Sequence, residues 1–183
     1  MIKDQLAVIT PILLALAGTL YPPTLDEQTL IDILGSDPVS FWKIIVRTFV
    51  HGDLFHFASN SLVFYFCTKT LLNQINVRKA TLLFFTAAVV GALTEFYASG
   101  NITIGMSGAV MAVFSFNIIV CLRKHLSPYY YLFVLVFPLQ DITGITTESE
   151  EPIAFWAHLG GFVVGMGFAM FFYRNKPFGV LRA

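Results

Sequence analysis

Four polar residues lie inside or at the edge of long apolar runs, and their types could support chemistry: His56, Asn60, Ser107 and His158. Polar and ionisable groups are costly inside a bilayer and are candidate functional residues there. A serine hydroxyl is a weak nucleophile until a base such as histidine accepts its proton, so Ser107 and His158 together could perform nucleophilic catalysis. Taken singly, each has a simpler explanation, because a serine often bonds within its own helix and a histidine often packs with its hydrogen bonds satisfied.

Composition indicates the kind of molecule that must hold these residues. Of the 183 residues, 56% are hydrophobic and 12% are charged, whereas soluble domains carry about 25% charged residues. We therefore expect one integral membrane domain over residues 1–183, surrounded by the lipid bilayer. The formal net charge is zero, and nothing in it favours a nucleic-acid partner. The first apolar run is expected to be retained, because Asp4 and a weak cleavage site argue against a signal peptide.

Apolar runs long enough for membrane helices predict an all-α polytopic protein with six spans. The expected spans are Gln5–Tyr21, Leu54–Leu72, Ala80–Ala98, Gly105–Leu122, Leu126–Gln140 and Ile153–Tyr173. The fifth is the shortest and contains Pro128 and Pro138. The polar loop Pro22–Asp53 could form one or two short interfacial helices.

The distribution of basic residues predicts the orientation. With both termini in the cytoplasm, nine of the 11 basic residues lie inside, as the positive-inside rule favours. The second, fourth and sixth spans then all run inward from the outer face. The four candidate residues would therefore share one shallow depth. The same topology places Cys67 and Cys121 near the reducing cytoplasmic side, so no disulfide is expected between them. The two cysteines are also not linked by any metal-ligand spacing.

Small residues recur along two of these spans and could bring them together. They are Gly108, Ala112 and Ser115 on the fourth span, and Ala157, Gly161, Gly165 and Ala169 on the sixth. Such stripes let helix backbones approach closely in lipid. Close approach of the two spans could put Ser107 within reach of His158.

Three motifs resemble those of rhomboid intramembrane serine proteases. "GMSG" around Ser107 is similar to the family's G-x-S-G, and "AHLGGFVVG" from Ala157 is similar to its A-H-x-x-G-x-x-x-G. "HGDLFHFASN" from His51 looks like the signature of the second span. The resemblance extends from about Trp42 to Met166 and matches the minimal six-span form, with a re-entrant loop before the fourth helix.

The resemblance implies roles for these residues. Ser107 would be the nucleophile and His158 the general base of a dyad without a third member. His56, Asn60 and the Ser107 backbone N–H would form the oxyanion hole, where the free N–H groups of a helix start suit a developing negative charge. Supporting roles would fall to Gly105, Gly108, His51, Met111 and Gly161. No metal or cofactor is implied, and the partners would be single-span membrane protein substrates cut near the outer face.

Three departures from the family pattern are visible, the first of which is that the family's usual Gly and Glu after the second span are not evident here. The family often has Trp-Arg in the first loop, where this chain has Trp42-Lys43, and a planar bidentate contact is lost with lysine. An aromatic residue commonly follows the serine by four positions and stacks on the histidine, whereas this chain has Met111. A thioether can still contact an imidazole.

The loop Asp141–Pro152 is expected to cap the site and the fifth span to form part of a lateral gate.

Two other functions fit parts of the pattern. The first is a catalytically inactive rhomboid-like membrane chaperone or client-binding protein, against which the presence of both Ser107 and His158 argues. The second is a small transporter, which would need polar residues through the full depth of the bilayer. The expected location is a prokaryotic inner membrane, and the oligomeric state does not follow from the sequence.

Overall fold

The computed structural model describes residues 2–20, 31–35, 37–124 and 154–174. Within these ranges the chain forms six α-helices and one short π-helix, with no strands. They are α1 (Ile2–Leu20), η2 (Ile31–Gly35), α3 (Phe41–Thr48), α4 (Leu54–Leu72), α5 (Val77–Ser99), α6 (Ser107–Lys124) and α8 (Phe155–Tyr173). The expected all-α class is confirmed for this part of the chain. The expected fifth span, cap and gate lie outside the described residues, so the six-span arrangement and the re-entrant loop stay predictions.

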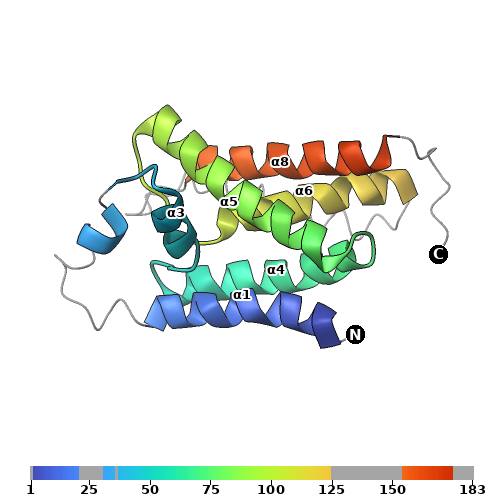
Figure 1. Ribbon diagram of the computed structural model, residues 1–183, viewed down its shortest axis with the longest axis horizontal. Coiled ribbons are helices and arrows are strands. Elements are labelled where there is room, and N and C mark those ends of the chain that lie inside the picture. The colour runs from blue at the N-terminus through green and yellow to red at the C-terminus, as the bar shows by residue number, and fades with distance from the viewer. Residues whose placement is uncertain (1, 21–30, 36, 125–153, 175–183) are drawn as a thin grey trace.

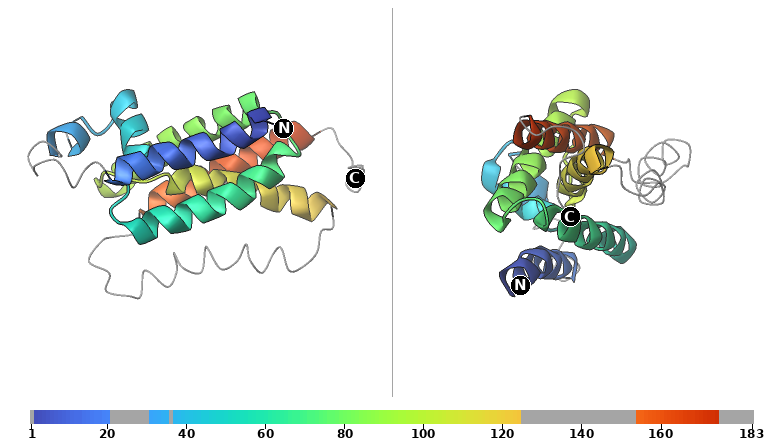
Figure 2. Two further views of the ribbon diagram at one scale, coloured as in Figure 1. Left: turned by 90° about the horizontal axis from the view of Figure 1, so that it is seen from below. Right: turned by 90° about the vertical axis from the view of Figure 1, so that its right-hand side faces the viewer.

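The long helices form a bundle in which α5 crosses the others at a slant, and α3 lies at one end of it (Figures 1 and 2). Helices α4, α6 and α8 begin at the α3 end, whereas α1 and α5 run in the opposite direction. Glycine contacts show the same relation between α6 and α8. Gly161 faces Gly108, and four residues further along both helices Gly165 faces Ala112, which is a parallel register.

Local signals explain where the helices begin and end. The Asp53 carboxylate accepts the His56 backbone N–H at 2.7 Å and caps α4, as expected of an aspartate at this position. The Asn76 side chain accepts the Lys79 N–H at 3.1 Å and caps α5. Helix α5 ends at Ser99 and is followed by the C-cap Gly100, whose φ of 79° suits glycine.

Helix α6 is the centre of the packing. Its residues from Gly108 to Asn117 are all buried, which is typical of a helix covered on every side. Polar side chains on α6 bond to its neighbours. The Ser115 hydroxyl donates to the Phe162 carbonyl at 2.8 Å, and the Asn117 amide donates to the Cys67 carbonyl at 2.8 Å. These bonds connect α6 to both α8 and α4.

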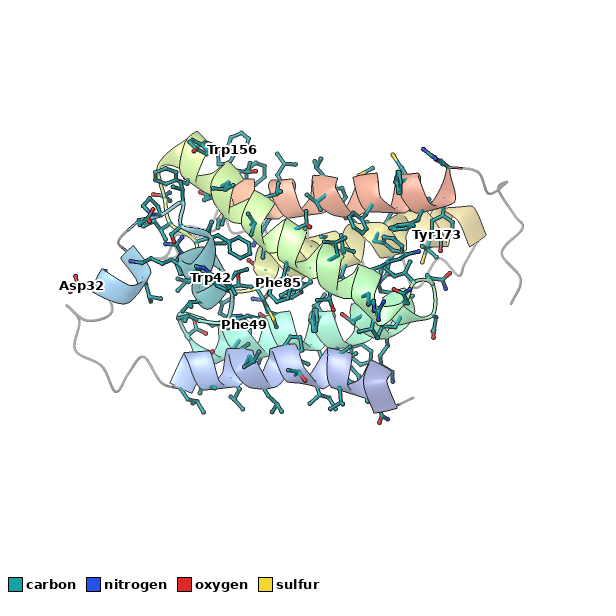
Figure 3. All side chains as sticks on the ribbon, viewed as in Figure 1. Asp32, Trp42, Phe49, Phe85, Trp156 and Tyr173 are labelled. Carbon is teal, nitrogen blue, oxygen red and sulfur yellow. The ribbon has the colours of Figure 1, made fainter. Side chains whose placement is uncertain are left out.

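The outer surface of the bundle is largely apolar (Figure 3). Exposed side chains include Leu62, Phe66, Leu82, Val163 and Phe171. Of the described helices, α5 and α8 are long and apolar enough to cross a membrane, and the apolar parts of α1 and α6 are shorter. Trp156 and Tyr173 mark the two ends of α8 in Figure 3. Contiguous apolar surface of this kind marks a membrane or partner contact.

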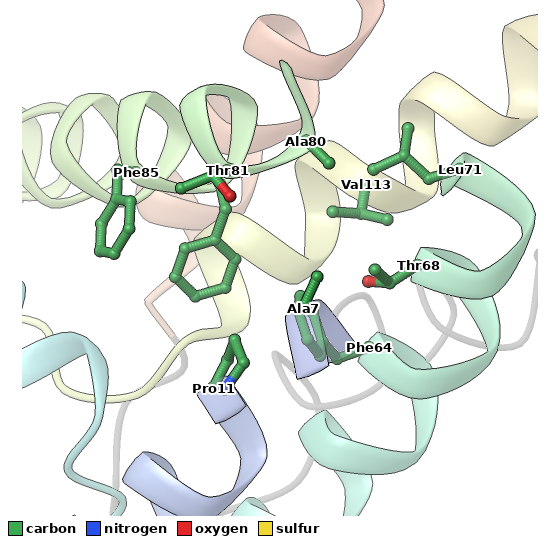
Figure 4. Close-up of a pocket in the computed structure, with 10 residues that line it drawn as sticks. Ala7, Pro11, Phe64, Thr68, Leu71, Ala80, Thr81, Phe85 and Val113 are labelled. Carbon is green, nitrogen blue, oxygen red and sulfur yellow. The ribbon is translucent and has the colours of Figure 1, made fainter. Parts of the chain in front are cut away.

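A cavity of about 50 Å³ lies among α1, α4, α5 and α6. Figure 4 shows Pro11, Thr68, Phe85 and Val113 around it. Ser107, His158, His56 and Asn60 are not among the described residues that line it. The cavity is therefore a packing gap between helices and not part of the candidate site.

The contact between α6 and α8 requires glycine at position 165. A Cβ at Gly165 would overlap the Ala112 carbonyl oxygen, whereas a Cβ at Gly167 meets nothing within 4 Å. We expect Gly165→Ala to lower the free energy of unfolding by about 1–3 kcal/mol through overpacking. Gly167→Ala, on the same helix, should leave it equal or raise it by about 0.5–1 kcal/mol. Denaturation of the purified proteins in detergent measures both, and equal stability of the two variants would contradict this packing.

Candidate active site

Gly105 forms the turn that leads into α6. Its φ of 94° lies in the region that favours glycine. Its N–H donates to the Arg47 carbonyl at 2.9 Å, which connects the turn to the end of α3. A Cβ at this position would lie 3.0 Å from His56 Cε1 and 3.4 Å from His51 Cδ2. Both imidazoles therefore pack against the turn two residues before Ser107.

Arg47 organises the segment that supports this turn. Its side chain is only 2% exposed, and its guanidinium donates to the Leu34 carbonyl at 2.7 Å and the Pro38 carbonyl at 2.5 Å. Burial lowers the pKa of Arg47, and the charge of Asp37 opposes that shift. In the sequence, Arg47 is one of the two basic residues expected on the outer side of the membrane, and this exception to the positive-inside rule was the signal that could have singled it out.

Lys43, where the family often has arginine, makes a smaller contact. Its ammonium donates to the Asp32 carbonyl at 3.2 Å. The buried guanidinium that holds the first loop is instead four residues further along, at Arg47. The lysine therefore still contacts the first loop, and the two-carbonyl contact of a planar fork is made by Arg47.

His51 is buried beneath the turn. The Met106 N–H points to His51 Nε2 at 3.5 Å, and the Thr19 hydroxyl lies 3.4 Å from Nδ1. The His51 and His56 rings lie edge to face with centroids 5.0 Å apart. Burial lowers the pKa of His51 from 6.5 to about 4, and the neighbouring His56 acts in the same direction, against the Phe49 backbone and Asp53. The imidazole is therefore neutral near pH 7.

Ser107 is the first residue of α6 and is partly buried. The first N–H groups of a helix have no partner within it, so the Ser107 N–H is of the kind that can bind an oxyanion. The next residue, Gly108, faces α8. A Cβ at Gly108 would lie 3.3 Å from the Ala157 carbonyl oxygen. Ala157 immediately precedes His158.

The structure thus brings the turn of Ser107 against the turn of His158. Gly161, for which the family resemblance implied a supporting role, lies directly against the α6 backbone, and a Cβ there would overlap the Gly108 carbonyl oxygen. His158 is partly buried in the first turns of α8. Met111 is buried one turn after Ser107, on the same helix.

Helix α4 contributes His56 and Asn60, which are four residues apart on one face. The Asn60 amide donates to the His56 carbonyl at 3.0 Å, and the Ser59 hydroxyl donates to the same oxygen at 3.0 Å. Asn60 is 5% exposed and His56 is partly buried. The His56 ring lies beside Gly105, so α4 presents its first turn to the loop that ends at Ser107.

Glu95 is a second residue that the sequence analysis did not assign to the site. It lies near the end of α5, is 3% exposed, and accepts the Ala157 N–H at 3.0 Å. No acidic partner for His158 was expected from the sequence. An ionisable residue within an apolar run was a signal that could have singled out this position.

The protein family that matches this chain fits the all-helical, apolar structure described above. The family model of the Rhomboid domain matches residues 38–175. Because the match covers well over half of the chain, this protein belongs to the rhomboid family, whose members are integral membrane proteins and generally serine intramembrane proteases. A comparison with curated proteins found no match. Helix α1 precedes the matched residues.

The buried neutral His51 predicts a loss of stability in acid. Its pKa of about 4 in the folded protein lies below the ordinary value of 6.5, so between these values the unfolded chain binds a proton that the folded protein does not. The stability from this residue is present above pH 6.5 and is lost as the pH falls toward 4. We expect the thermal midpoint to fall less steeply from pH 7 to pH 4.5 in His51→Gln than in the wild type. Parallel curves for the two proteins would contradict a neutral buried His51.

Proposed function

We propose that this protein is an active serine endopeptidase that cleaves single-span membrane proteins within the bilayer. The observation that supports this most directly is the parallel contact of α6 and α8 at Gly108 and Ala157. Ser107 and His158 are the immediate neighbours of these two residues. Family membership supports this reaction class, and the helix contact supports a pairing of a serine nucleophile with a histidine base.

The proposed reaction is acyl transfer in two steps. The Ser107 hydroxyl attacks a substrate peptide carbonyl while His158 accepts the hydroxyl proton. The tetrahedral intermediate then collapses, His158 returns the proton to the leaving amine, and an acyl-enzyme forms at Ser107. Water hydrolyses this ester by the same route, with His158 as the base, and releases the carboxylate product.

Charge on the tetrahedral oxygen needs preorganised donors. The Ser107 N–H at the start of α6, the His56 imidazole and the Asn60 amide are proposed for this role. The packing of the His56 ring against Gly105 supports a position near the serine turn. Donors of this kind act in a site with little water, where each is worth more than in solution.

The proposed setting is a prokaryotic inner membrane, with both termini in the cytoplasm and six spans. The bias of basic residues supports this orientation. The site would then face the outer side, because α4, α6 and α8 all begin at the end of the bundle that carries α3 (Figure 1). Substrates would be cut near the outer ends of their single spans.

The central test replaces the two proposed catalytic residues. We expect Ser107→Ala and His158→Ala each to lower kcat for a co-reconstituted single-span reporter by a factor on the order of 10⁴. Labelling by a fluorophosphonate should be lost in Ser107→Ala. Ser115→Ala is the matched control, since it removes a hydroxyl that bonds to the Phe162 carbonyl on the same pair of helices. Persistent cleavage by Ser107→Ala would overturn the proposal, and a wild type that neither cleaves nor labels would favour an inactive relative.

A second test concerns the oxyanion hole. We expect Asn60→Ala to lower kcat by about 10²-fold with little change in KM, because a donor used in the transition state is lost. Ser59→Ala is the matched control, since Ser59 and Asn60 donate to the same His56 carbonyl. If both variants lose equal activity, the effect comes from that carbonyl bond and Asn60 is not an oxyanion donor.

A further inference from the structure

Glu95 bonds across the bundle to the helix that carries His158. Its Oε2 accepts the Ala157 N–H at 3.0 Å, and its Oε1 accepts the Ser99 hydroxyl at 2.6 Å. The side chain is 3% exposed. Both carboxylate oxygens are therefore used, as a buried acid requires if its burial is to be tolerated.

The beginning of α8 has no cap of its own. Ala154 stands at the N-cap position and makes no side-chain capping bond. The first turn of a helix leaves N–H groups without intrahelical partners. In α8 the His158 N–H donates to the Ala154 carbonyl at 3.1 Å, so the Ala157 N–H lies before this bond. The Ala157 N–H therefore needs an acceptor from elsewhere, and Glu95 provides it. A carboxylate at this position also suits the positive end of the helix dipole.

The same stretch of α5 contacts α8 on both sides of His158. A Cβ at Gly91 would lie 2.8 Å from the Ala157 carbonyl oxygen, and a Cβ at Gly160 would lie 2.7 Å from the Thr94 hydroxyl. Ala157 and Gly160 flank His158 in sequence. Helix α6 packs on the other side through Gly108, so the backbone around His158 is held between α5 and α6. The bond from Glu95 to the Ala157 N–H fixes the position of this backbone along the axis of α5.

We propose that Glu95 is a positioning residue for His158. It caps α8 from a neighbouring helix and sets the position of the backbone from which the imidazole reaches Ser107. Its carboxylate accepts from the Ala157 backbone N–H and the Ser99 hydroxyl, so it acts through the helix and is not placed as a third member of the dyad. This inference rests on the proposed Ser107–His158 chemistry for its effect on rate, and on the Ala157 bond alone for its effect on α8.

Two substitutions of similar length separate hydrogen bonding from packing. In Glu95→Gln, the amide oxygen can accept the Ala157 N–H while the amide NH₂ donates to the Ser99 hydroxyl. The single proton of that hydroxyl can point instead to the Glu95 backbone carbonyl, which lies 2.9 Å away, so the hydroxyl oxygen can serve as the acceptor. In Glu95→Met the volume is similar, but the strong acceptor is absent.

The experiment measures cleavage of a reconstituted single-span reporter by the full-length wild type, Glu95→Gln and Glu95→Met. Rates are taken per folded protein, well below each thermal midpoint. We expect Glu95→Met to lose about 10- to 100-fold in kcat with little change in KM, as misplacement of a catalytic group does. Glu95→Gln should stay within about threefold of the wild type and keep its pH profile.

Hydrogen–deuterium exchange over residues 154–160 provides a readout that does not depend on activity. Exchange there should be faster in Glu95→Met and unchanged in Glu95→Gln. Wild-type kcat and exchange in Glu95→Met would overturn the inference, and so would equal losses in the two variants, because charge and not the hydrogen bond would then be required. If Ser107→Ala still cleaves, the proposed function fails, and the exchange result still decides whether Glu95 holds α8.

Discussion

The close parallel contact of α6 and α8 is the constraint on which the rest of the structure depends. At Gly161 and Gly165 the helices approach until no Cβ fits between them, and at Gly108 a Cβ would be in tight contact with the Ala157 carbonyl oxygen at 3.3 Å. In lipid, apolar side chains gain little by leaving one apolar surface for another, so backbone contact and interhelical hydrogen bonds must hold the helices together. Ser115 donates such a bond to the Phe162 carbonyl. The contact also fixes the register of the two helices, and hence which residues lie opposite each other at their starts.

The second requirement is a non-helical approach to the start of α6. Irregular backbone near a membrane is tolerated where its polar groups find partners. Here the Gly105 N–H bonds to the Arg47 carbonyl, and the Met106 N–H points to His51 at 3.5 Å. The segment that precedes α3 is itself held by the Arg47 guanidinium, which donates to the Leu34 and Pro38 carbonyls. The first loop and the serine turn are thus one hydrogen-bonded unit, and a change in either alters the support of the other.

Much of this could be predicted from the sequence, because its strongest patterns have simple causes. Long apolar runs indicated the helices, and α4 has the expected limits Leu54–Leu72. The small-residue stripes indicated the pairing of α6 with α8. Arg47 and Glu95 were not assigned to the site, because their roles depend on carbonyl and N–H groups far away in the sequence. No periodicity of residue types reports which backbone group a buried charge will meet.

The residue at position 111 increases the importance of the backbone around His158. The family resemblance leads one to expect an aromatic ring there, which would hold an imidazole by stacking. Methionine is unbranched and adapts its shape to its surroundings, so it specifies the orientation of a neighbour less strongly. The orientation of His158 then depends more on where α8 places its Cα. That position is set by Gly161 against α6 and by the Ala157 N–H against Glu95. Methionine at position 111 on α6 is thus compatible with a histidine base, provided that the packing of α5 and α8 stays rigid.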